Sequence, residues 1–276
     1  MIIDAHHHFW QYSPAEYGWI DDSLRALRRD FLPADLEKAI RAAGVDGVVS
    51  VHARQSLVET HWLLDFAARH AFIKGVVGWL PLKEPDVRKL LERHAANKRL
   101  KGLRHVIQGE PDEAYLLNDD FNRGVDLLPE FGLTFDILIY ERQLPAAIRF
   151  VDRHPKQVFV LDHLAKPRIR ERILAPWREN LRELARRENV YGKLSGLVTE
   201  ADFMRWTPQE LQPYMQAALE AFGPRRLMFG SDWPVVTVAS DYGRWLKFVR
   251  AFTARLTPDE QAAILGGNAT RVYQLS

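Results

Sequence analysis

Short runs of β-branched and apolar residues recur along the whole chain, and amphipathic helical segments separate most of them. We predict eight strands, near Ile2–His8, Gly47–His52, Lys74–Leu80, Gly102–Ile107, Leu133–Ile139, Val158–His163, Val190–Ser195 and Leu227–Asp232. Several runs are continuously apolar, which is typical of parallel strands buried on both faces. Strand and helix alternating eight times is the pattern of a (β/α)8 TIM barrel, an α/β fold.

No Gly/Ser linker, low-complexity segment or internal repeat divides the 276 residues, so we expect one domain over residues 1–276. Residues 9–32, after the first predicted strand, are too long for an ordinary connection and carry Trp10, Tyr12, Tyr17 and Trp19. Long loops at the C-terminal ends of barrel strands usually build the binding site. Packing beneath a surface loop is the alternative role for each of these aromatic rings.

Charge and composition exclude several classes of protein. The net charge of +2 is spread without blocks of like charge, which argues against a nucleic-acid partner. The absence of cysteine excludes disulfides, thiol nucleophiles and thiolate metal sites. No apolar run reaches membrane-spanning length, and the N-terminus enters the first strand without a signal-peptide pattern. We therefore expect a cytoplasmic protein without a membrane partner; a homo-oligomer is left open.

The triplet His6-His7-His8 ends the first predicted strand. Alternate side chains of a strand share a face, so we expect Asp4, His6 and His8 on the same face. Two imidazoles with a carboxylate behind them can hold a divalent metal or stabilise a developing oxyanion. An expression tag or a surface run of histidines is the alternative, but a tag needs more consecutive histidines and would precede the strand.

Polar residues recur at the predicted C-terminal ends of the strands, where barrel enzymes place their catalytic side chains. They are His6, His8, His52, Arg54, Gln55, Arg104, His105, Asp136, His163, Ser195 and Asp232. Asp232 would face the first strand across the closed barrel, where it could ligate a metal, act as general base on a water, or do both. A helix N-cap is its alternative role. At the end of the sixth strand we expect His163, and not Asp162, to point inward.

Several motifs resemble those of one family. Residues 4–8, Asp-Ala-His-His-His, resemble the Asp-x-His-x-His motif that opens the amidohydrolase superfamily, and residues 229–232 are similar to its closing Gly-[Ser/Thr]-Asp segment. Residues 267–273 resemble the C-terminal helix of the amidohydrolase-2 branch. Three segments further resemble the sugar-lactonase group of that branch, with its L-fuconolactonases and L-rhamnonolactonases: residues 51–56, 162–167 and 193–197.

The resemblance implies that His6, His8, His163 and Asp232 are the catalytic residues and the ligands of a metal, if one is bound. Binuclear members of the superfamily use a carboxylated lysine at the end of the fourth strand, and residues 102–105 contain none. Lys193, on the seventh strand, is expected to be structural or substrate-facing. These observations leave one divalent cation, Zn²⁺, or none, because imidazole donors could polarise an activated ester directly.

The activity implied is hydrolysis of a sugar-acid lactone, L-fucono-lactone or a close aldonolactone, to the open aldonate. Asp232 would take a proton from water, and the histidines would stabilise the oxyanion directly or through a metal. Expected substrate contacts are Arg54, Gln55, His105, Trp19, Trp79 and Trp233. The alternatives are a metal-dependent decarboxylase of the amidohydrolase-2 type and a non-catalytic carbohydrate-binding barrel.

Overall fold

A computed structural model describes all residues 1–276. Its sheet contains eight strands, and each pairs in parallel with the next one along the chain. The strands are β1 Ile3–His7, β2 Gly47–Val51, β3 Ile73–Gly78, β4 Leu100–Val106, β5 Thr134–Leu138, β6 Phe159–Leu161, β7 Val190–Leu194 and β8 Leu227–Phe229. The predicted (β/α)8 barrel is confirmed.

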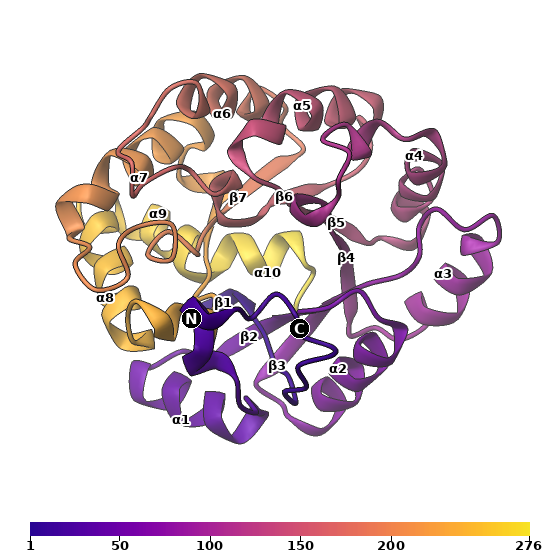
Figure 1. Ribbon diagram of the computed structural model, residues 1–276, viewed down its shortest axis with the longest axis horizontal. Coiled ribbons are helices and arrows are strands. Elements are labelled where there is room, and N and C mark those ends of the chain that lie inside the picture. Colours follow the sequence, from indigo (N-terminus) through magenta and orange to yellow (C-terminus); the bar gives the residue numbers. More distant parts are fainter.

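Helices form a ring outside the strands (Figure 1). They are α1 Pro33–Ala43, α2 Leu57–Arg69, α3 Val87–Ala95, α4 Asp119–Val125, α5 Leu144–Arg153, α6 Trp177–Ala185, α7 Pro208–Phe222 and α8 Tyr242–Thr253, followed by the short α9 Pro258–Ala262 and α10 Asn268–Val272. α1 begins at a proline, and its C-cap is Gly44, which has a left-handed φ of 68°. None of the helices combines the length and apolar composition that crossing a bilayer requires.

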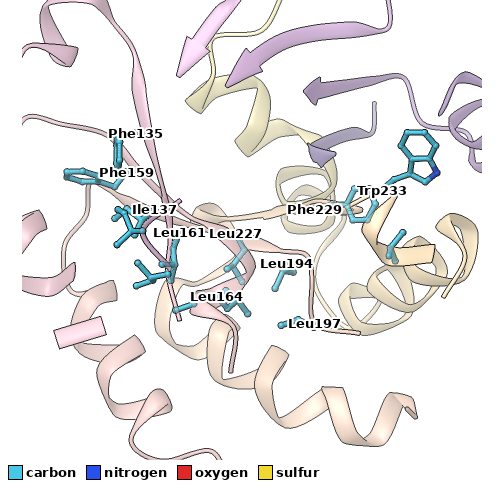
Figure 2. Packing of buried hydrophobic residues seen from close by; sticks show 14 of the residues in the cluster. Phe135, Ile137, Phe159, Leu161, Leu164, Leu194, Leu197, Leu227, Phe229 and Trp233 are labelled. Atoms are coloured by element: carbon cyan, nitrogen blue, oxygen red, sulfur yellow. The ribbon is translucent and has the colours of Figure 1, made fainter. Parts of the chain in front are cut away.

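Alternation along each strand divides the core into two layers. Side chains such as Phe135, Phe159 and Leu161 point outward and pack beneath the helices (Figure 2). Residues between them point into the barrel, where Val160 belongs to a smaller cluster of ten buried residues. That cluster includes Tyr273 beside α10, and α10 lies across the middle of the barrel in Figure 1. The C-terminal segment therefore closes the end of the barrel where the strands begin.

The barrel closes between its last and first strands through residues that follow β8. The Asp232 N–H donates to the His6 carbonyl at 2.8 Å, and the His8 N–H donates to the Trp233 carbonyl at 2.7 Å. This close approach requires glycine at position 230, because a Cβ there would lie 2.8 Å from the His6 Cβ and 3.0 Å from the Ser195 Cβ. The seam thus places Asp232 beside the histidines of β1.

A bulge in β1 changes which side chains face the barrel interior. Asp4 pairs with Val48 and His7 with Ser50, so β1 contains one residue more than β2 over this stretch. Asp4 consequently points outward, where it accepts hydrogen bonds from the Ser231 N–H at 2.8 Å and from the Tyr242 hydroxyl at 2.9 Å. The expectation that Asp4 shares a face with His6 and His8 is wrong, because strict alternation does not continue through a bulge.

Candidate active site

Three imidazoles surround one carboxylate oxygen at the strand ends. Oδ1 of Asp232 lies 3.4 Å from Nε2 of His8, 3.7 Å from Nε2 of His6 and 3.9 Å from Nε2 of His163. Nε2 of His6 and Nε2 of His8 are 3.1 Å apart. All four residues are buried. The structure therefore brings together the four residues that the sequence singles out as catalytic, from β1, β6 and the segment after β8.

Both residues that follow β6 point inward, although only His163 was expected to. Val160 faces the barrel interior, so alternation directs Asp162 inward as well. The chain then leaves the extended conformation at His163, whose φ of 53° begins a run of left-handed residues through Lys166. This turn swings the imidazole back over the barrel toward Asp232. The expectation for Asp162 is wrong, since its carboxylate forms buried ion pairs with Arg104 and Lys193.

Hydrogen bonds fix the orientation of two of the imidazoles. Nδ1–H of His8 donates to the Val51 carbonyl at 2.8 Å, so its Nε2 faces the cluster. Nδ1 of His163 lies 2.9 Å from the Ser195 hydroxyl oxygen, and its Nε2 faces Asp232. Gly196 leaves room for this ring, because a Cβ at that position would lie 2.5 Å from Nδ1 of His163.

A buried charged network supports the cluster from below. Nζ of Lys193 lies 2.6 Å from Oδ2 of Asp136, 2.9 Å from Oδ1 of Asp162 and 3.1 Å from Nδ1 of His6. Nη1 of Arg104 lies 3.0 Å from Oδ2 of Asp162. Two cations thus balance two carboxylates, as burial requires. The sequence analysis gave these residues no role in the network, although alternation from the outward Phe159 and Leu161 signals the inward position of Asp162.

The burial of the cluster sets its charges. Burial raises the pKa of the Asp232 carboxyl, but His163, His8 and Lys166 lower it more, so this pKa lies below its usual value. Burial lowers the pKa of His163 to about 4 and holds the pKa of His6 well below its usual value. At neutral pH an ionised carboxylate therefore faces neutral imidazoles at His6 and His163, an arrangement suited to a general base beside hydrogen-bond donors or metal ligands.

A family model described as Amidohydrolase matches residues 3–275. The chain belongs to the amidohydrolase family. This amidohydrolase is 41% identical to an L-fucono-1,5-lactonase of Burkholderia multivorans, across 100% of this chain and 96% of the relative. It is 37% identical to an L-fucono-1,5-lactonase of Burkholderia ambifaria, across 99% and 95% of the two chains. The resemblance inferred from the motifs is confirmed.

A solved structure of an amidohydrolase from Burkholderia multivorans with bound Zn superposes on this amidohydrolase with a TM-score of 0.96, at 42% identity and over 100% of both chains. The donor atoms of the present cluster fit such an ion. A tetrahedral zinc with bonds of about 2.0–2.1 Å places its ligand atoms about 3.3 Å apart. Nε2 of His6, Nε2 of His8 and Oδ1 of Asp232 lie 3.1–3.7 Å from one another and form a group that could hold a metal ion. Nε2 of His163 lies 3.9 Å from Oδ1 of Asp232.

The residues predicted to contact substrate are more scattered in the amidohydrolase. The Arg54 guanidinium pairs with Glu16 and Glu59, and Oε1 of Gln55 accepts a hydrogen bond from the Val106 N–H at 2.7 Å. These contacts tie the long loop after β1, and the loop after β2, to their neighbours. Neither side chain belongs to the imidazole cluster, so their contact with a substrate stays a prediction.

His105 and the three tryptophans also lie outside the cluster. Nε2 of His105 lies 2.6 Å from a Glu110 carboxylate oxygen, and its Nδ1 accepts from the Trp79 indole at 3.3 Å. The Trp233 ring is buried against aromatic neighbours, and the Trp19 ring is 41% exposed on the loop after β1. Their roles as substrate contacts stay predictions.

A cavity of about 480 Å³ opens among the loops that follow β5, β6 and β7. Lys166 and Glu200 line it; Lys166 lowers the pKa of the Asp232 carboxyl, and Asp232 raises the pKa of Glu200, so the cavity lies near the Asp232 carboxylate. Nζ of Lys166 lies 3.8 Å from Oε1 of Glu200 and 5.5 Å from the centre of the Tyr140 ring. The sequence analysis missed these three residues, because they lie in loops beyond the strand ends.

The lowered pKa of Asp232 predicts the pH dependence of the reaction. A general base must be unprotonated, so a reaction that uses Asp232 as its base is lost as the pH falls through this pKa and is retained above it. We expect kcat/KM to be retained from neutral pH down to the usual aspartate pKa of 3.8, and protonation of Asp232 to lower it only below that value. Initial rates measured in a constant-ionic-strength buffer series check this. An acid limb centred near neutrality would contradict the assignment of Asp232 as the base.

Proposed function

We propose that this amidohydrolase opens the ring ester of a sugar-acid lactone by adding water, and that L-fucono-1,5-lactone or a close aldonolactone is its substrate. The observation that carries the proposal is the position of the Asp232 carboxylate, whose Oδ1 lies within 3.9 Å of three imidazole nitrogens. The two Burkholderia relatives quoted above at 41% and 37% identity, both named as L-fucono-1,5-lactonases, support the same class of substrate.

In the proposed reaction Asp232 is the general base. Its carboxylate takes a proton from a water molecule as the water oxygen forms a bond to the lactone carbonyl carbon. The resulting tetrahedral centre carries a negative oxygen. When the bond to the ring oxygen breaks, Asp232 returns its proton to that oxygen. The products are a free hydroxyl, which carries the proton returned by Asp232, and a carboxylic acid on the opened chain, which releases its proton to solvent. Asp232 is ionised again as soon as its proton has passed to the ring oxygen.

The imidazoles stabilise the negative oxygen of the tetrahedral centre. Nε2 of His6 and Nε2 of His163 both face Asp232, so a carbonyl bound above the carboxylate lies within their reach. A divalent cation held by His6, His8, His163 and Asp232 would polarise the same carbonyl as a Lewis acid. Without a cation, an imidazole N–H directed at the oxygen serves this purpose, since an ester carbonyl needs less activation than an amide.

The cavity beside Asp232 suits the polar face of a sugar. Tyr140, Lys166 and Glu200 offer a phenol, an ammonium and a carboxyl, all of which form hydrogen bonds with hydroxyl groups. Burial raises the pKa of Glu200, so its carboxyl retains a proton to higher pH than an exposed one. We propose that these three residues select among lactone stereoisomers.

A panel of aldonolactones assayed with a pH indicator tests the proposed function. We expect turnover of L-fucono-1,5-lactone and weaker turnover of its stereoisomers, with acid released as each ring opens. The same assay after treatment with a chelator measures how far the reaction depends on a metal. Binding of every lactone without acid release would overturn the proposal in favour of a carbohydrate-binding barrel, and carbon dioxide release from an aromatic acid would favour a decarboxylase.

A further inference from the structure

A groove of about 440 Å³ lies on the outer surface of the barrel, between α7, α8 and the loop after β7, and we call it the α7–α8 groove. The two helices are neighbours in the outer ring (Figure 1). Its lining residues on α8 recur every three or four positions and so share one face of the helix; they are Arg244, Lys247, Phe248, Ala251 and Phe252. This face extends about 12 Å along the helix axis, at 1.5 Å per residue. No residue of the imidazole cluster lines the groove, so it is a separate surface of the molecule.

The floor of the α7–α8 groove is apolar. The Trp206 and Phe248 rings lie with their centroids 6.1 Å apart, and Phe252 continues the floor along α8. The indole N–H of Trp206 donates to the Ala239 carbonyl at 2.6 Å, so this ring has only carbon atoms left to offer a ligand. Ala251 is exposed on the same face, and its small side chain keeps the groove open. An apolar chain bound here would remove water from its own surface and from the floor.

Three cations and no carboxylate line the same groove. Cζ of Arg244 lies 4.1 Å from the centre of the Trp206 ring, so its guanidinium covers one end of the floor. Cζ of Arg255 lies 4.9 Å from the centre of the Phe252 ring at the other end. Lys247 is exposed on α8, one turn after Arg244. None of the three cations forms an ion pair with a carboxylate of the chain. Unpaired cations beside an apolar floor attract an anion, and their hydrogen bonds to a charged group are stronger than those to a neutral one.

We propose that the α7–α8 groove is a binding site for a small amphiphilic anion, a free carboxylate with a single aliphatic chain of medium length. The chain lies on the apolar floor, and the carboxylate pairs with Lys247 and Arg244 at the rim. The volume suits one molecule of this size, since pockets for small ligands begin at about 300 Å³. The charges decide the class of ligand, because a neutral chain leaves the cations unpaired and a sugar does not cover the apolar floor. The proposal does not rest on the proposed function.

Titration calorimetry of the full chain with sodium decanoate, below its micelle-forming concentration, tests the proposal. We expect one saturable site for decanoate and no saturable binding of decyltrimethylammonium, which has the same chain and the opposite charge. Lys247→Gln should weaken decanoate binding about two- to fivefold, the range for one exposed ion pair. Lys89→Gln is the matched control, because Lys89 is an exposed lysine of α3 on the opposite side of the barrel (Figure 1), and it should leave binding unchanged. Ala251→Glu places a carboxylate in the groove and should abolish binding.

Two results would overturn the proposal: equal affinity for decanoate and decyltrimethylammonium, or unchanged decanoate binding by Ala251→Glu. Light scattering on the same proteins tests a second copy of this chain as the occupant. A wild-type dimer that both Lys247→Gln and Ala251→Glu convert to a monomer would overturn the proposal in favour of that copy. Thermal unfolding verifies that the variants fold, and if Ala251→Glu does not, the two probes and Lys247→Gln still decide the outcome. No measurement uses a lactone, so failure here is distinguishable from failure of the proposed function.

Discussion

Replacing Asp232 by asparagine is expected to lower kcat by about 10²- to 10⁴-fold, the usual contribution of a general base. Asparagine has the shape of aspartate but does not take a proton from water at neutral pH. The hydrogen bond from the N–H of residue 232 to the His6 carbonyl does not involve the side chain. The closure of the barrel between β8 and β1 is therefore retained. Steady-state kinetics on the best aldonolactone measure the effect, and thermal unfolding verifies the fold.

The matched control is Asp241→Asn, further along the same segment. Asp241 caps α8 by accepting a hydrogen bond from the Arg244 N–H, and asparagine caps helices as well as aspartate does. This variant should retain wild-type turnover. Near-normal turnover of Asp232→Asn would remove Asp232 as the base and, with it, the proposed mechanism.

Replacing Gly196 by alanine should have the second-largest effect, although this residue performs no chemistry. The added Cβ would lie 2.5 Å from Nδ1 and 2.7 Å from Cγ of His163, distances that folded proteins do not tolerate. The imidazole must therefore move away from Asp232. We expect kcat/KM to fall about 10²-fold, the scale that misplacing a reacting group by about 1 Å produces.

Alanine at Gly196 also adopts an unfavourable φ of 66°, and this second effect needs its own control. Gly44→Ala provides one, because Gly44 has a φ of 68° and no neighbouring atom within 4 Å of the added Cβ. Both variants should lose about 1–2 kcal/mol of stability from the left-handed backbone. Only Gly196→Ala should lose activity. Equal activity of the two variants at a temperature where both are folded would contradict the proposed role of His163.

The fold could be predicted from the sequence because each strand is a short apolar run between helices. All eight strands occur where they were predicted, and the boundaries differ by a few residues. The largest difference is the last strand, which ends at Phe229 and not at Asp232. Residues 230–233 continue toward β1 through isolated hydrogen bonds, and apolar periodicity does not report a pairing that short.

The candidate site could be predicted from the sequence only in part. Residues at the ends of parallel strands converge whatever their side chains, so topology alone brings His6, His8, His163 and Asp232 together. Which neighbouring residue points inward depends on single backbone irregularities, the bulge in β1 and the positive φ of His163, and neither has a sequence signal. The direction of a long side chain such as Arg54 follows from its ion-pair partners, which lie on other elements.

The pairing of residue 232 with β1 also determines when the barrel can close during synthesis of the chain. A ribosome releases the histidines of β1 at the start of translation and the aspartate near its end, and the first strand has an unpaired edge throughout that interval. Nascent chains and C-terminally truncated products accordingly lack the carboxylate, and they present an open sheet that other chains can join. Catalytic competence and protection from aggregation thus arise together, when the last part of the chain emerges.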